Sequence, residues 1–184
     1  MLSENWDKEK IIYGLWHRFS GVIYAAYSLY RATGNESIWP SRKIFRIRNK
    51  CFDGEVWKDL RKGKKSVSYW CHGTIGIGLT RLYLLKNGFD NDQVRADLLN
   101  CVDNVINMEF EEPGICHGNM GRFLFLKEVQ NSEMISVATR KKINVLLSSM
   151  VKNILDNGIK INSFDKKVCF GINDRHYRNL DMVY

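Results

Sequence analysis

The sequence has little proline, two residues in 184, and contains no long uninterrupted apolar segment. Few prolines argue against proline-rich linkers and favour a mostly helical chain. A membrane-spanning helix needs roughly 18 or more consecutive apolar residues, and no stretch of the sequence approaches that length. Residues 1–7 also lack the basic start and apolar run of a secretion signal. We therefore expect a cytoplasmic protein with no transmembrane segment.

The sequence also lacks an even set of cysteines from which a disulfide framework is built. Its five cysteines are an odd number, and cytoplasmic thiols stay reduced. These cysteines are Cys51, Cys71, Cys101, Cys116 and Cys169. Free thiols or metal ligands are therefore expected instead of disulfides.

Basic residues outnumber acidic ones, 28 against 20, which gives a net charge of +8. Many of them lie in two clusters, within residues 42–50 and 58–65. Such clusters can attract phosphate backbones or acidic peptides. Neither cluster matches a known nucleic-acid-binding motif, so we expect a solvated basic surface and no nucleic-acid partner. A nucleic-acid binder is a hypothesis that rests on charge alone.

Three blocks of the sequence share the pattern His-x-x-x-Gly followed by an apolar, helix-compatible run. They begin at His17, His72 and His117, with spacings of 55 and 45 residues between the histidines. A degenerate fourth copy follows Cys169, where phenylalanine replaces the histidine. An internal repeat of this length predicts a repeated structural unit.

The segments between these blocks have amphipathic patterns. Residues 94–106 and 132–155 each place apolar side chains on one helical face. Ser132 is typical of a helix N-cap, and Asn157 with Gly158 is typical of a C-terminal cap. Each repeat then contains a Gly-rich turn, a buried apolar helix and an amphipathic outer helix. Stacked repeats of this kind predict an all-α fold, an α/α toroid, whose Gly-rich turns all lie at one end.

Cys-His-Gly occurs twice at equivalent positions of the repeat, beginning at Cys71 and at Cys116. Thiolate and imidazole are preferred ligands of zinc, and three protein ligands leave the open position of a catalytic zinc site. A single pair would mean little, since free cysteine is also a common buried residue. Two pairs at equivalent positions favour a metal site. His17 by itself would be interpreted as a core or capping histidine.

The wider strings resemble signatures of the lanthionine cyclases, the LanC-like family. Residues 68–77, Ser-Tyr-Trp-Cys-His-Gly-Thr-Ile-Gly-Ile, resemble Ser-x-Trp-Cys-x-Gly-x-x-Gly-Ile. Residues 115–121, Ile-Cys-His-Gly-Asn-Met-Gly, resemble Leu-Cys-His-Gly-x-x-Gly. Residues 14–22, Gly-Leu-Trp-His-Arg-Phe-Ser-Gly-Val, resemble an earlier signature, Gly-x-x-His-Gly-x-(Ala/Ser)-Gly. The similarity covers roughly residues 13–127 and is greatest to the C-terminal cyclase domain of type II lanthipeptide synthetases.

This resemblance implies an α/α toroid that holds zinc (Zn²⁺) through Cys71, Cys116 and His117, with His17 as the acid/base residue. It implies a precursor peptide with dehydrated serine or threonine and a free cysteine as the substrate of lanthipeptide biosynthesis. The peptide thiol adds to the alkene and forms a lanthionine or methyllanthionine thioether ring. A thiolate is the nucleophile of such an addition, and an imidazole that titrates near neutrality can protonate the resulting enolate.

The sequence departs from the family pattern at two points. Arg18 stands where the family has glycine, and a cation there favours neutral His17, which is the weaker proton donor. Further helical hairpins of the family are missing, so we expect residues 1–184 to form a single, partial LanC-like domain, the zinc-site half of an incomplete toroid. Three explanations are compatible with this expectation: a fragment, a truncated gene product, or a subunit whose ring a partner chain completes.

Other functions are compatible with parts of this pattern. One alternative is a catalytically weak or inactive LanC-like zinc protein that binds a thiol or peptide. Another α/α toroid, a glycosidase or a prenyltransferase, is a weaker alternative. The Gly-rich turns lack the paired carboxylates that a glycosidase needs.

Overall fold

The computed structural model of the chain describes residues 19–39, 52–59, 65–66, 68–71, 73–109 and 113–157. The α-helices in these ranges are α1 (Phe19–Thr33), α3 (Thr74–Lys86), α4 (Asp92–Ile106), α5 (Asn119–Gln130) and α6 (Val137–Asn157). A short 3-10 helix, η2 (Glu36–Ile38), and two antiparallel strands, β1 (Lys58–Asp59) and β2 (Lys65–Ser66), complete the described elements. None of the described helices has the length and apolar character that a bilayer crossing requires.

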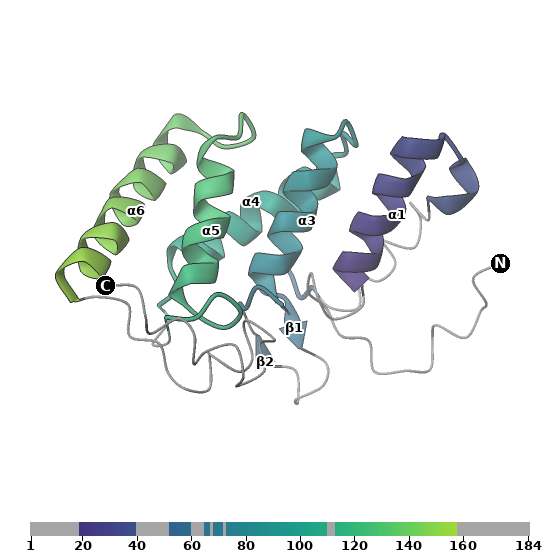
Figure 1. The fold of residues 1–184 in the computed structure, drawn as a ribbon. Coiled ribbons are helices and arrows are strands. Elements are labelled where there is room, and N and C mark those ends of the chain that lie inside the picture. The colour runs from purple at the N-terminus through teal and green to yellow at the C-terminus, as the bar shows by residue number, and fades with distance from the viewer. Residues whose placement is uncertain are drawn as a thin grey trace, which may run out of the picture.

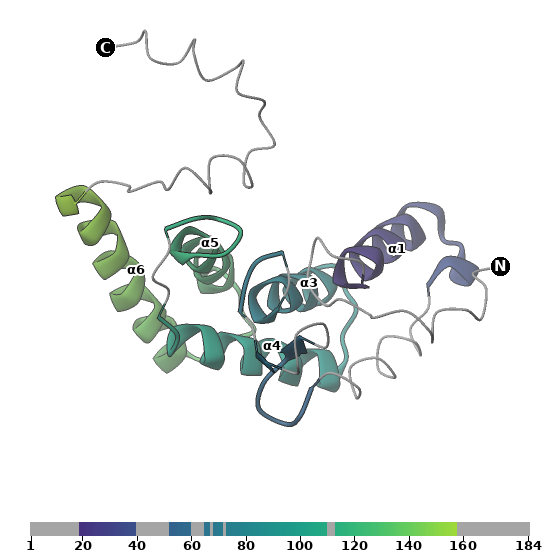
Figure 2. The same ribbon diagram turned by 90° about the horizontal axis from the view of Figure 1, so that it is seen from below.

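The helices are arranged in an inner and an outer layer. Helices α1, α3 and α5 stand side by side in the inner layer, and each begins at the same end of the molecule (Figure 1). Figure 2 shows α4 and α6 along the outer side of an open arc. Helix α3 contacts α1, α4 and α5, while α6 contacts α5 and α4. This all-α arrangement of inner and outer helices confirms the predicted α/α-toroid architecture, here as an open arc.

Helix α3 lies at the centre of the core. Its sequence is apolar on most faces, and a helix of this kind is usually buried. Gly78 permits the close packing of three helices at this point. A Cβ atom at position 78 would lie 2.7 Å from the ring of Phe125 on α5 and 3.0 Å from Cβ of Cys101 on α4. Gly78 therefore allows α3 to approach both α5 and α4 closely.

Helix α4 buries the face that its amphipathic pattern predicts. Asn91 caps its first turn, since its side-chain oxygen accepts hydrogen bonds from the N–H groups of Gln93 and Val94. The residues of the predicted face that are buried against the core are Val94, Leu98, Cys101, Val102 and Val105. The position of the outer helix in this repeat is thereby confirmed.

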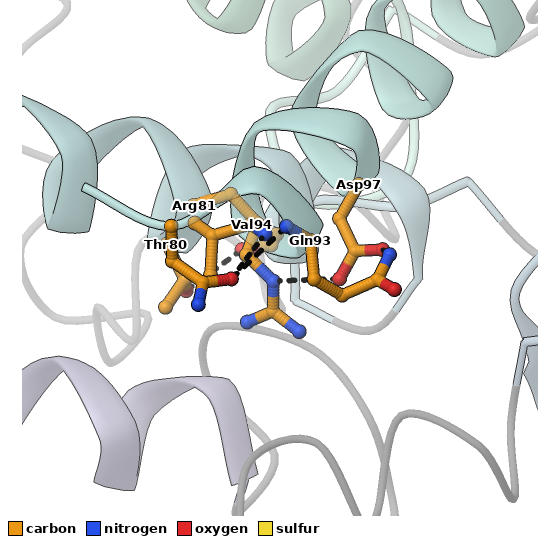
Figure 3. A network of polar contacts seen from close by, with 7 residues as sticks. Thr80, Arg81, Gln93, Val94 and Asp97 are labelled. Atoms are coloured by element: carbon orange, nitrogen blue, oxygen red, sulfur yellow. Dashed lines mark hydrogen bonds and ion pairs between the residues drawn. The ribbon is translucent and has the colours of Figure 1, made fainter. Parts of the chain in front are cut away.

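A buried ion pair also joins α3 to α4. Arg81 Nε donates to Asp97 Oδ2 at 3.2 Å, and the side chains retain only 5% and 1% exposure. The side-chain amide of Gln93 donates to the other carboxylate oxygen of Asp97 at 3.2 Å (Figure 3). A buried carboxylate needs such partners, because an unpaired buried charge is strongly destabilising.

The prediction of where the second outer helix begins was wrong. Helix α6 begins at Val137, and Ser132 does not cap it. The Ser132 hydroxyl accepts the N–H of Met134 in a turn, whereas Ser136 accepts the N–H of Thr139 at 3.1 Å and caps the helix. Two serines with the same local chemistry precede this helix, so composition alone did not distinguish them. The helix extends to Asn157, and Gly158 of the predicted C-terminal cap lies outside the described ranges, so that cap stays a prediction.

Candidate metal centre

The two turns that carry the predicted metal ligands lie beside one another. Cys71 belongs to the turn before α3, while Cys116 and His117 belong to the turn before α5. Since α3 and α5 are in contact and begin at the same end, the turns meet there (Figure 1). The N–H of Trp70 donates a hydrogen bond to the carbonyl oxygen of Cys116 at 3.0 Å. A backbone hydrogen bond therefore ties one ligand turn to the other.

The first turn is closed at its base. Ser68 and Gly73 form an isolated antiparallel bridge around the segment that contains Cys71. Gly73 has a φ of 124°, a conformation that residues with a Cβ rarely adopt. The tight turn buries Cys71, which is 2% exposed. The backbone conformation of this turn thus favours glycine at position 73.

The second turn folds back onto the first residues of α5. The carbonyl oxygens of Pro113 and Gly114 accept the N–H groups of Met120 and Gly121, at 3.2 and 3.5 Å. A Cβ atom at position 121 would overlap the carbonyl oxygen of Ile115. Gly121 therefore allows the loop that carries the second ligand pair to lie against the helix.

The three candidate ligand atoms converge. Sγ of Cys71 lies 3.5 Å from Nε2 of His117, and all three ligand atoms, with that of Cys116, lie within 4.8 Å of one another. Tetrahedral zinc, with bonds of about 2.3 Å to sulfur and about 2.0–2.1 Å to nitrogen, places sulfur and nitrogen about 3.6 Å apart and two sulfurs about 3.8 Å apart. The donor atoms fit a zinc ion after small side-chain movements.

The exposure of the ligands is uneven. Cys71 is buried, whereas Cys116 and His117 are half-buried. The cluster is thus reached from the side of the second turn. Three donors, two of them thiols, with one accessible side are what a zinc site with an open coordination position requires.

Tyr69 contacts one of the candidate ligands. Its ring lies edge-on to the imidazole of His117, with ring centroids 4.6 Å apart and an interplanar angle of 76°. Aromatic pairs prefer such T-shaped geometry, so Tyr69 limits the rotation of the imidazole. Sequence patterns did not identify this residue. The family signature Ser-x-Trp-Cys leaves its position open, and no local pattern marks it.

Cys101 is a packing residue of the core. It has no exposed surface, and burial raises the pKa of its thiol to about 12. It lies on α4, at the contact with α3, and does not belong to the candidate ligand group.

The predicted acid/base residue is not among the residues that the structure describes. His17 and Arg18 both lie outside the described ranges, and α1 begins at the next residue, Phe19. Cys51 and Cys169 lie outside them as well. The catalytic role of His17 therefore stays a prediction.

Comparison with known proteins identifies the family. No curated protein matches the sequence at a significant level. A family model described as lanthionine synthetase C-like protein matches residues 2–171, a range that contains both ligand turns and all of the described helices. The chain therefore belongs to the lanthionine synthetase C-like family.

Proposed function

We propose that this chain is a zinc-dependent cyclase that forms lanthionine or methyllanthionine rings on a dehydrated precursor peptide. Family membership supports lanthionine-cyclase-type chemistry in general. The zinc dependence that we propose rests on one observation, the convergence of Cys71, Cys116 and His117. Their ligand atoms lie within 4.8 Å of one another. These residues would hold the metal, and His17 would act as the acid/base residue.

The reaction is an addition that consumes no cofactor. The peptide thiol loses its proton, its sulfur bonds to the β-carbon of the dehydrated residue, and the α-carbon gains a proton. When bound, zinc at an open position lowers the pKa of a substrate thiol, so that the thiolate is available at neutral pH. The two cysteines and the histidine would hold the ion, and Tyr69 orients the imidazole. His17 delivers the proton to carbon, as a residue that titrates near neutrality can.

A peptide assay with matched cysteine variants tests this proposal. The zinc-loaded chain is incubated with a synthetic peptide that carries one dehydroalanine and one cysteine, and the remaining free thiol is counted over time. We expect Cys71→Ala to lose both zinc and thiol consumption, whereas Cys101→Ala, which removes a cysteine outside the cluster, keeps zinc at one ion per chain. Equal zinc contents in the two variants would exclude the site. Equal rates of thiol loss would show uncatalysed addition.

Arg18 favours a second candidate, a zinc protein that holds a thiol or peptide with little turnover. A cation beside His17 favours the neutral imidazole and weakens it as a proton donor. If Arg18 has this effect on His17, the chain should bind zinc at full occupancy but cyclise the peptide slowly. The Arg18→Gly variant should then have a higher rate of cyclisation. Rapid thiol loss in the unmodified chain that depends on both Cys71 and His17 would exclude this candidate.

A further inference from the structure

A groove of about 550 Å³ lies along helix α3, beside the candidate metal centre. Its walls come from α1, α3 and α5 and from Trp70, the residue before Cys71. This volume lies within the range of about 300–1,000 Å³ that is usual for ligand pockets. The groove therefore has the size of a binding site and is formed by the inner helices.

The walls of the groove are mainly apolar and aromatic. The rings of Tyr24 on α1 and Tyr83 on α3 lie 3.9 Å apart, and Leu79 continues the apolar surface along α3. The Tyr83 hydroxyl is hydrogen-bonded to the hydroxyl of Ser28, at 2.7 Å. This bond fixes the ring to α1 and leaves its apolar surface to line the groove.

An ion pair is the polar part of the lining. Lys86 on α3 and Glu128 on α5 are 3.2 Å apart, and both side chains are exposed. The pair carries no net charge, so it does not attract a charged ligand of either sign. A charged side chain in the apolar part would lose hydration without gaining a partner.

Trp70 connects the groove to the ligand cluster. Trp70 lines the groove, is bonded to Cys71 and donates its N–H to the carbonyl oxygen of Cys116. Leu79, Tyr83 and Lys86 follow one another at helical spacing on one face of α3, over about 10 Å of helix. An extended peptide spans about 3.3–3.6 Å per residue, so about three residues fit along this face.

We propose that this groove binds apolar side chains next to the reacting cysteine of the precursor peptide. The identity of this ligand rests on the proposed function. A peptide whose cysteine enters the ligand cluster has its neighbouring residues beside Trp70, from where they continue along α3. Aromatic or aliphatic neighbours bury apolar surface against Tyr24, Leu79 and Tyr83, while acidic neighbours do not. The groove thus selects which cysteine of a precursor reacts.

Two labelled synthetic peptides test the groove by fluorescence anisotropy. They have the same length and one cysteine, flanked in one by phenylalanine and leucine and in the other by aspartate and serine. We expect the zinc-loaded chain to bind the apolar peptide at least ten-fold more tightly. Tyr24→Asp should reduce this preference to less than three-fold at unchanged zinc content, and so should Tyr24→Ser, which removes the ring without adding charge.

Val22→Asp is the matched control. Val22 lies on the same helix and is 38% exposed, against 40% for Tyr24, but it does not line the groove. This variant should keep the full preference. Equal binding of the two peptides by the unmodified chain would overturn the proposal, and so would a preference that survives both Tyr24 variants. The proposal would also be overturned if the unmodified chain were a dimer and Tyr24→Ser dissociated this dimer while peptide binding stayed unchanged. The groove would then bind a second copy of the chain.

A further variant separates this proposal from the proposed function. Cys71→Ala removes the metal site but leaves the groove, so the ratio of the two peptide affinities should persist in the zinc-free protein. A preference for the apolar peptide in an unmodified, zinc-loaded chain that consumes no thiol would support the groove and reject the cyclase. Loss of the ratio in Cys71→Ala at an unchanged melting temperature would reject the groove as an independent site.

Discussion

The backbone N–H of Trp70 donates a hydrogen bond to the carbonyl oxygen of Cys116, across 3.0 Å and between two turns of the repeat. This main-chain bond holds the turn of Cys71 against the turn of the second ligand pair. Sγ of Cys71 then lies 3.5 Å from Nε2 of His117. The three candidate donors are thus brought together by the packing of two helices and by one main-chain contact.

Gly121→Ala should disturb the candidate metal centre without changing a ligand. The added Cβ overlaps the carbonyl oxygen of Ile115, so the loop that carries Cys116 has to move. We expect a loss of about 1–3 kcal/mol in the free energy of unfolding, as in other overpacked sites, together with weaker zinc binding. Urea unfolding and competition with a chromophoric chelator measure the two effects. Met120→Ala, one residue earlier, is the control and should keep zinc affinity within about two-fold. Unchanged zinc affinity in Gly121→Ala would contradict the prediction.

Tyr69 should contribute to zinc affinity through its ring. A T-shaped aromatic contact contributes about 0.5–1.5 kcal/mol, so Tyr69→Ala should weaken zinc binding by about two- to ten-fold. Tyr69→Phe keeps the ring and should bind zinc as the unmodified chain does. The absorption spectrum of the cobalt-substituted protein reports on ligand geometry and should change in the alanine variant alone. If the phenylalanine variant is as weak as the alanine variant, the hydroxyl and not the ring contact is responsible.

Asp97→Asn should destabilise the fold strongly. The substitution leaves the buried Arg81 guanidinium without its counter-charge, and such a loss costs about 3–5 kcal/mol. The double variant Arg81→Met/Asp97→Leu removes both charges and should be clearly more stable than Asp97→Asn. Asp90→Asn is the control, since the Asp90–Arg95 pair is exposed and contributes about 0–1 kcal/mol. Similar melting curves for Asp97→Asn and Asp90→Asn would contradict the prediction.

Cys101 should resist alkylation in the folded protein, whereas Cys116 should react once the metal is removed. Burial raises the pKa of Cys101 to about 12, and the thiolate is the reactive form. Because the pKa of Cys101 in the folded protein lies above the ordinary cysteine value of 9.0, folding favours the neutral thiol. This stabilisation is present below pH 9 and is lost as the pH rises from about 9 toward 12.

Iodoacetamide labelling at pH 8, followed by peptide mapping, compares the two cysteines in the metal-stripped chain. Labelling of Cys101 at the rate of Cys116 would show that the α3–α4 contact opens readily. In urea unfolding, Cys101→Ala should lose less stability between pH 9 and pH 12 than the unmodified chain. An identical pH dependence of the two proteins would contradict the assigned pKa.

The sequence by itself was sufficient for the architecture and for the candidate ligands. The buried face of α4 follows from helical periodicity, which is a local property of the chain. The repeat drew attention to the two Cys-His-Gly motifs, and the resemblance to the lanthionine cyclases then implied Cys71, Cys116 and His117 as the ligands among them. Residue type alone did not predict the N-cap of α6, because Ser132 and Ser136 lie near one another and have the same chemistry. A capping signal names a residue type, but the path of the chain decides which serine meets a free N–H.

Contacts between distant segments were decided only by the tertiary structure. The approach of Cys71 to His117 requires that α3 and α5 pack together, and no local pattern encodes that distance. The edge-on contact of Tyr69 with His117 depends on the relative rotation of two turns. The groove joins side chains of three helices, whose separations are set by packing at residues such as Gly78. Periodicity determines which face of a helix is apolar, but the distance and orientation between helices depend on the side chains that meet there.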